Sequence, residues 1–226
     1  MPSGSAGSCA SWASASASAR SSATGAARPQ PGGRGQTGAA FLRHHAPATW
    51  ACDFLPVVNL PFRPRYACFV IALDSRRVVH VGVTRHPTAA WVAQPLREAT
   101  PFEQRPHFLI WDNERKYGQA FARVAASRRI TVLRTPIRTP RAYATGARFL
   151  GSVRRECLDH VLVLGEGHLQ CVLRAYVTYF NTARPHQGIW QAIPARPEPA
   201  PATCPPGSIV SIPVLGGLHH EYRRAA

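Results

Sequence analysis

Three strand-like segments lie between residues 50 and 84 with only short turns between them, and this arrangement restricts the fold more than any other feature. The segments are Trp50–Val58, Tyr66–Leu73 and Arg77–Thr84. Connections this short leave no room for a crossover helix, so neighbouring strands are expected to run antiparallel, as in a meander. The middle segment, YACFVIAL, is a long apolar run with aromatic and β-branched residues, which is typical of a central strand.

Beyond residue 84, helical and strand-like patterns alternate. The expected helices and strands are Ala89–Glu98, His107–Trp111, Tyr117–Ser127, Thr131–Arg134, Ala144–His160 and Gly167–Ala183. The order predicts an α/β protein with a mixed five-stranded sheet, an antiparallel meander followed by parallel strands, flanked by helices. A doubly wound nucleotide-binding fold is excluded, because the first three strands have no helical crossovers between them.

Composition divides the chain into three parts. Residues 1–36 contain 24 Ser, Ala and Gly residues and no acid, which predicts a disordered leader, with an organellar transit peptide as the alternative. Residues 37–193 are the expected core. Residues 194–226 begin as a Pro-rich linker and end in a stretch that predicts a hairpin around Gly216-Gly217. No apolar run approaches the roughly 20 residues of a membrane span, so we expect no membrane partner.

The chain is strongly basic. It carries 27 Lys and Arg residues against 11 acids, a net charge of +16, and Lys116 is its single lysine. Such an excess favours a polyanionic partner, nucleic acid above all, although a solvated basic surface is the alternative. The six cysteines form no Cys-x-x-Cys pair, which is typical of reduced thiols in a cytoplasmic protein.

The scarcity of acids makes two of them informative. Asp53 lies within the first apolar strand, and Asp112 directly follows the strand that ends at Trp111. If these strands are neighbours, both carboxylates meet at one edge of the sheet, where a divalent cation would relieve their repulsion. The alternatives are an arginine partner for Asp53 and a turn or helix N-cap role for Asp112.

Eight motifs, taken in order, resemble the DDE transposases and integrases of bacterial insertion sequences, whose core is ribonuclease H-like. They are AAFLRHHA, WACDF, RRVVHVGVTRHPTAAWVAQ, FLIWDNERKY, RTPIRTPRA, VRRECLDH, FNTARPH and PVLGGLHHEYRRAA. The resemblance runs from Thr37 to the C-terminus and implies DNA integration, with DNA strand cleavage and transfer by two Mg²⁺ or Mn²⁺ ions. It implies that Asp53 and Asp112 are catalytic residues and metal ligands.

The third acid of the family is missing. Ala147, 35 residues beyond Asp112, occupies the position where the family has a catalytic Glu. Glu156 lies nine residues further on, and at about 100° per residue it falls on the opposite face of the helix. Tyr143 and Pro56 also depart from the family pattern, and Pro56 is expected to interrupt the first strand. We therefore expect a catalytically degenerate core, truncated before the family's helix-turn-helix domain.

Positive residues around the expected site are candidate DNA contacts. They are Lys116, Arg138, Arg141, Arg148 and Arg155. Contacts to phosphates are independent of base sequence and sensitive to salt. The resemblance implies DNA as partner, a bacterial cytoplasmic location, and homo-oligomers or association with an intact transposase. The alternative function is a non-catalytic DNA-binding remnant or inhibitor. The Arg184-Pro185-His186 motif is expected to end a helix and pack locally.

Overall fold

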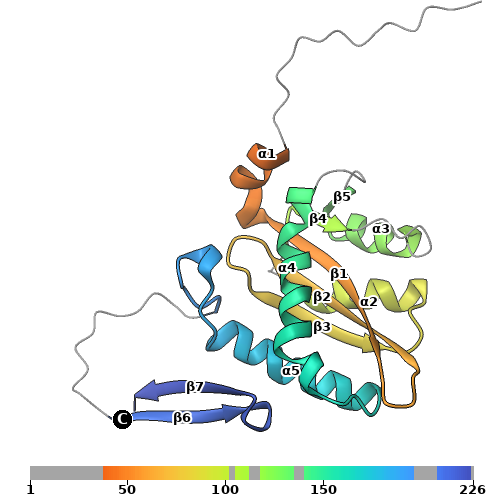
Figure 1. Cartoon of the computed structure of the whole chain (residues 1–226). Coiled ribbons are helices and arrows are strands. Elements are labelled where there is room, and N and C mark those ends of the chain that lie inside the picture. Colours follow the sequence, from red (N-terminus) through yellow and green to blue (C-terminus); the bar gives the residue numbers. More distant parts are fainter. Residues whose placement is uncertain (1–37, 102–104, 112–117, 135–139, 196–207, 225–226) are drawn as a thin grey trace, which may run out of the picture. The chain divides into compact units, whose positions relative to one another are not determined.

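The structure is a computed structural model that describes residues 38–101, 105–111, 118–134, 140–195 and 208–224. All of these residues belong to one unit of the chain, residues 36–226. Its central feature is a five-stranded sheet (Figure 1) with the order β3-β2-β1-β4-β5. The strands are β1 (Thr49–Val58), β2 (Pro64–Ala72), β3 (Val78–Thr84), β4 (Phe108–Trp111) and β5 (Thr131–Arg134).

Strand β1 separates two kinds of pairing. It pairs antiparallel with β2, which in turn pairs antiparallel with β3, and these three strands form the predicted meander. On its other side β1 pairs parallel with β4, and β4 pairs parallel with β5. The predicted mixed sheet is therefore confirmed.

Helices cover both faces of this sheet. Helices α2 (Ala89–Ala99) and α3 (Gly118–Ser127) pack on one face, and α4 (Pro140–Glu156) and α5 (Glu166–Thr182) pack on the other. The alternation of β2 explains both layers: Cys68 and Val70 contribute to the α2/α3 core, whereas Phe69 and Ile71 contribute to the α4/α5 core. A strand that is buried on both faces reads as a continuous apolar run, as this one does.

Strand β1 runs unbroken through Pro56, so the prediction that this proline interrupts the strand is wrong. Pro56 pairs with Tyr66 of β2, but β4 reaches only as far as Cys52 on the other side. Beyond Cys52, no described residue of β4 pairs with that side of β1. Proline is tolerated at strand edges because its missing N–H removes no ladder bond there.

The remaining elements lie at the two ends of the unit. Helix α1 (Gly38–His45) and the 3-10 turn η1 (Ala46–Ala48) precede β1. Short 3-10 turns η2 (Leu158–His160) and η3 (Gln187–Ile189) flank α5. The predicted hairpin is present as β6 (Ile209–Val214) and β7 (His219–Arg224), joined by η4 (Leu215–Gly217), in which Gly216 and Gly217 have positive φ values of 67° and 94°.

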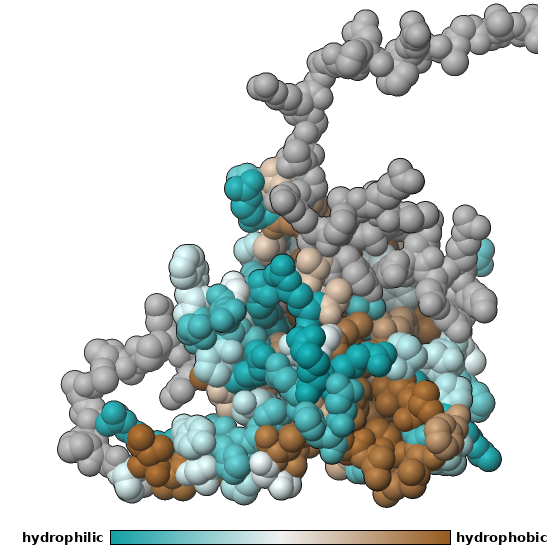
Figure 2. All heavy atoms as spheres, in the orientation of Figure 1, coloured by the Kyte–Doolittle hydropathy of each residue, from teal (hydrophilic) through white to brown (hydrophobic). Residues whose placement is uncertain are grey.

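Polar and apolar side chains are segregated on the face that carries α4. Figure 2 shows hydrophilic side chains gathered over α4 and a hydrophobic patch beside its C-terminal end. Exposed apolar side chains at that end belong to Val58, Leu60, Phe62, Leu162 and Leu164. Among the described residues, none of the helices is both long and apolar enough to span a membrane.

Candidate active site

Asp53 lies in the centre of the sheet. It is 7% exposed and occupies β1, where it pairs with Phe69 of β2 and directly follows the last residue paired with β4, Cys52. Because side chains alternate along a strand, Asp53 shares the face of Leu55 and Val57, which belong to the core beneath α4 and α5. Its Oδ1 accepts a hydrogen bond from the backbone N–H of Phe54 at 2.7 Å. A carboxylate is thus held at the boundary between the sheet and α4.

The register of β1 and β4 places the residues before the two aspartates side by side. Cys52 pairs with Trp111 at the carboxyl end of β4. Asp112 follows Trp111 directly but lies outside the described residues, as do Lys116 and Arg138. That the two carboxylates meet therefore stays a prediction, and the parallel pairing of the preceding residues is the observation that supports it.

Helix α4 approaches Asp53 through a glycine. A Cβ atom added at Gly146 would lie 3.7 Å from Asp53 Oδ2 and 4.0 Å from its Cβ. Ala147 is the next residue of α4 and is exposed. The helix turn that borders the carboxylate thus contains glycine and alanine. The sequence alone identified Ala147 as the departure from the family, but it did not indicate that Gly146 makes the close approach.

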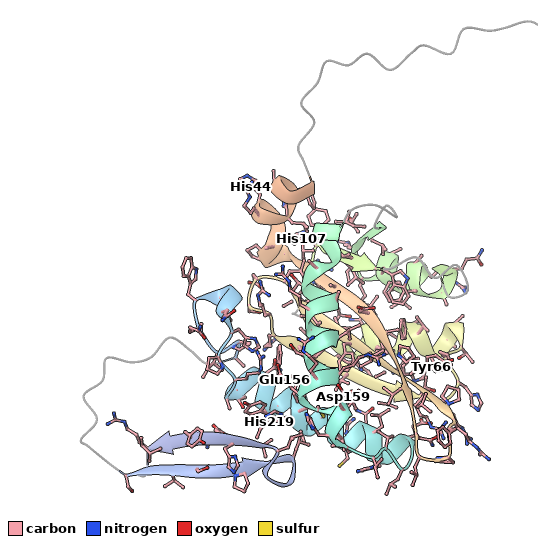
Figure 3. The ribbon with its side chains drawn as sticks, viewed as in Figure 1. His44, Tyr66, His107, Glu156, Asp159 and His219 are labelled. Carbon is pink, nitrogen blue, oxygen red and sulfur yellow. The ribbon has the colours of Figure 1, made fainter. Side chains whose placement is uncertain are left out.

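Glu156, the next acid along α4, belongs to a different network. Its Oε2 accepts hydrogen bonds from Arg184 Nε and Tyr176 OH, both at 2.8 Å, and its Oε1 accepts one from Arg184 Nη2 at 2.5 Å. His219 of β7 also approaches this end of α4 (Figure 3), where its Nε2 lies 2.7 Å from the Glu156 carbonyl oxygen. Glu156 therefore joins α4, α5 and the hairpin.

The charge of Glu156 is stabilised within this network. Burial raises the pKa of the Glu156 carboxyl, but hydrogen bonds from Arg184 and Tyr176 and the positive charge of Arg184 outweigh burial and leave the pKa below its ordinary value. The ionised carboxylate is thus engaged by Arg184 and Tyr176, which agrees with the expectation that it does not replace the missing Glu at Ala147.

The Arg-Pro-His motif packs locally, as expected. Arg184 binds Glu156 and its Nη1 lies 3.0 Å from His186 Nδ1. His186 is buried, with Nε2 3.1 Å from the carbonyl oxygen of Phe180, so Nε2 donates and Nδ1 accepts. Burial lowers the pKa of His186, which keeps the imidazole neutral.

The two described arginines of α4 that are candidate DNA contacts have different surroundings. Arg148 and Arg155 are both exposed, but Arg155 folds back along its own helix, with Nη1 3.1 Å from a Cβ position built at Gly151. Arg148 instead lines a cavity of about 650 Å³ between α4 and the loop after α5. The side chain of Arg141 lies outside the described residues. The same cavity contains Arg76, which sequence reasoning missed because it belongs to the β2–β3 turn, far from α4 in sequence.

The carboxylates of the candidate site could supply only some of the ligands that two metal ions need. Carboxylate oxygens are the ligands that Mg²⁺ prefers, and Asp53 supplies one carboxylate. Among the described residues there is no group of three or more His, Cys, Asp or Glu side chains that could hold a metal ion. With Asp112 the sequence offers two carboxylates, and Ala147 offers none where a third is expected. Two carboxylates could hold one divalent ion, but a second ion would have no carboxylate of its own.

Comparisons with known proteins agree with this geometry. Residues 128–194 match the family model described as Integrase core domain. No curated protein sequence matches the chain.

Solved structures match over most of the described unit. A chain of the simian T-cell lymphotropic virus intasome in complex with the PP2A regulatory subunit B56 gamma aligns with a TM-score of 0.54 at 16% identity. That alignment covers 78% of this chain and 66% of the viral chain. The HTLV-2 integrase catalytic core domain in complex with magnesium, in its dimeric form, aligns with a TM-score of 0.51 at 16% identity, over 66% of this chain and 96% of that one.

The fold is that of an integrase catalytic core. The trimeric form of the HTLV-2 core aligns equally, with a TM-score of 0.52 at 14% identity over 65% of this chain and 96% of that one. The ribonuclease H-like fold predicted from the motifs is thereby confirmed. The identities are low, so the roles of individual residues rest on the geometry described above.

Proposed function

We propose that this chain is a DNA-integration core of the bacterial insertion-sequence type that still binds DNA and has lost strand cleavage and transfer. The observation that carries the proposal is the turn of α4 beside Asp53. There Gly146 makes the close approach and Ala147 follows, so the buried carboxylate faces a turn of α4 that contains no acid. The match to the Integrase core domain and the intact sheet and helices support the same class of function.

The loss of the third acid affects one half of the chemistry. In two-metal strand transfer, one ion activates the attacking hydroxyl and the other stabilises the leaving oxygen. Asp53 and Asp112 would hold a single Mg²⁺ or Mn²⁺, and the second ion would lack its carboxylate. Each 1.4 kcal/mol of lost transition-state stabilisation slows the reaction about tenfold, so losing several kcal/mol reduces activity below detection.

Binding to DNA does not need the missing acid. The net charge of +16 and the exposed arginine Arg148 favour contacts to phosphates. The HTLV-2 cores are dimeric and trimeric and the simian virus chain belongs to an intasome, which supports a homo-oligomer here. The second candidate function is inhibition of an intact transposase. The fully packed core favours it, because a folded but inactive subunit can occupy a place in a mixed oligomer.

The test compares two alanine-to-glutamate variants. Ala147→Glu restores an acid at the expected third position, and Ala175→Glu makes the same change at an exposed alanine of α5. We expect Mn²⁺ to raise the Tm of Ala147→Glu clearly more than the Tm of the parent and of Ala175→Glu, in which Asp53 and Asp112 would hold one ion. Strand-transfer assays should detect no product from the parent chain. Robust transfer by the parent, abolished by Asp53→Asn, would overturn the proposed loss of activity.

A further inference from the structure

Two arginines line one cavity, and none of the described residues that line it is an acid. The cavity of about 650 Å³ lies between α4, the β2–β3 turn and the loop after α5, and both Arg76 and Arg148 line it. Neither forms an ion pair with any carboxylate among the described residues. Arg184 also lines the cavity, but Glu156 neutralises its charge. His186 is neutral. Within the part of the chain that the structure describes, the cavity therefore contains two positive charges with no carboxylate partner.

The backbone conformation and the surroundings of Arg76 both reduce the stability of the protein. Its φ is 59°, in the left-handed region that non-glycine residues rarely adopt. Its Nε is buried and has no hydrogen-bond partner in the described part of the chain. Burial lowers the pKa of Arg76, and the positive charge of Arg148 lowers it further. Strain, an unsatisfied donor and like-charge repulsion converge on one residue, and strained residues cluster at catalytic and ligand-binding sites.

Gly188 makes room for this guanidinium. A Cβ added there would lie 2.5 Å from both Cζ and Nη2 of Arg76, which is closer than such atoms can approach. Gly188 belongs to η3, in the loop that His186 and Ala192 close with a bridge. The loop thus holds the Arg76 guanidinium against a residue without a side chain. Hydroxyl and amide groups complete the lining, from Thr145, Ser152, Gln187 and Gln191.

We propose that this cavity binds a phosphate group, with Arg76 and Arg148 as its two guanidinium ligands. Guanidinium groups match phosphate geometry through paired N–H donors, and an anion between them removes their repulsion. The hydroxyls and amides are further donors for the remaining phosphate oxygens. The assignment of the phosphate to a DNA strand rests on the proposed function; a free phosphate compound is the other source of the same chemistry.

The experiment uses three cavity variants and one control in the full chain. Arg76→Asn and Arg148→Gln each remove one charge, whereas Gly188→Ala displaces the Arg76 guanidinium without changing the charge. Arg123→Gln removes an exposed arginine of α3, on the opposite face of the sheet. Pyrophosphate at constant ionic strength should raise the Tm of the parent and of Arg123→Gln, and should not raise the Tm of the three cavity variants. Without ligand, Arg76→Asn should melt at least as high as the parent, since asparagine tolerates the left-handed region.

Binding to a 20-base-pair duplex, measured against salt concentration, identifies the source of the phosphate. If the strand supplies it, Arg76→Asn and Arg148→Gln each reduce the slope of log affinity against log salt by about one, and saturating duplex removes the pyrophosphate effect. Pyrophosphate binding with unchanged duplex binding would overturn the assignment to DNA. Equal responses of all variants to pyrophosphate would overturn the site itself. Failure of the parent to bind any duplex would refute the proposed function, while the pyrophosphate measurements still test the cavity.

Discussion

Replacing Glu156 with glutamine should destabilise the protein substantially. The carboxylate accepts two hydrogen bonds from Arg184 and one from Tyr176, and the Glu156 and Arg184 side chains are each 25% exposed. Glutamine keeps the shape of the side chain, but both carboxylate oxygens accept from Arg184, so the NH₂ group faces a guanidinium N–H in either orientation. At least one charge-assisted hydrogen bond, worth about 1.5–3 kcal/mol, is lost and the others lose their charge assistance, so we expect a loss of about 2–4 kcal/mol in the free energy of unfolding.

The assay is urea unfolding followed by tryptophan fluorescence, supported by thermal melts. For a domain of this size 1 kcal/mol corresponds to about 2–4 °C, so the Tm should fall by roughly 4–16 °C. Asp159→Asn is the matched control, because Asp159 follows Glu156 closely in the sequence, is exposed and forms no ion pair among the described residues. Both residues are labelled in Figure 3. Its effect should stay within about 0.5 kcal/mol.

Two outcomes would refute this reasoning. Equal stability of Glu156→Gln and Asp159→Asn would show that the network contributes nothing measurable. Loss of a Mn²⁺-dependent rise in Tm in Glu156→Gln, when the parent shows one, would make Glu156 a metal ligand and not a structural residue. A double-mutant cycle with Arg184→Met should give a coupling energy of about 1–3 kcal/mol, since the two residues are in direct contact.

Three further results are expected. The parent should bind unrelated DNA duplexes with similar affinity and lose orders of magnitude of affinity between 50 and 200 mM salt, as phosphate contacts do; affinity that is independent of salt would contradict the phosphate model. Phe149→Ala should lower the free energy of unfolding in urea by about 3–5 kcal/mol. Phe149 is 4% exposed and packs edge-on against Phe69 and Phe180 at ring-centroid distances of 5.0 and 4.8 Å. A loss below 1 kcal/mol would show that neighbouring side chains fill the space left by the phenyl ring. Burial lowers the pKa of His186 and His80 below the ordinary 6.5, so these residues bind protons in the unfolded chain at a higher pH than in the folded one. The free energy of unfolding should therefore be at its full value above pH 6.5 and decline below it. His186→Gln should show a smaller decline between pH 7.5 and 5.5, and a pH-independent parent would rule out buried neutral histidines.

The sheet was predictable because its pattern is local. The turns between the first three strands are short, and the buried run of β2 shows in consecutive residues. The helix α4 begins at Pro140, four residues before the predicted start at Ala144, because proline suits the first turn of a helix even when no apolar periodicity has begun. The sequence therefore predicted that this segment is a helix, but not that the helix begins at Pro140, because proline is usually associated with loops.

The candidate site was predictable only in part, because its details are contacts between distant segments. The motifs located Asp53 and Ala147, but the approach of Gly146 to Asp53 depends on how α4 rotates over the sheet. Arg76 gave no signal, since its backbone conformation and its contact with Gly188 arise from a turn and a loop more than 100 residues apart. The spacing of side chains along one helix gives no information about contacts between segments that are far apart in the sequence.

The place of β1 in the sheet also has a consequence for the order of folding. Its antiparallel partner β2 is its neighbour in the sequence, whereas Thr49 pairs with Phe108, 59 residues further along. Because closing a longer loop is slower, the meander can assemble before β4 arrives beside it. Substitutions in the β1–β2 turn should then change the refolding rate, and those in β4 the unfolding rate. The β1–β4 pairing at Cys52 and Trp111 would thus form late, so a partly folded chain would hold Asp53 on a formed strand before β4 lies beside it.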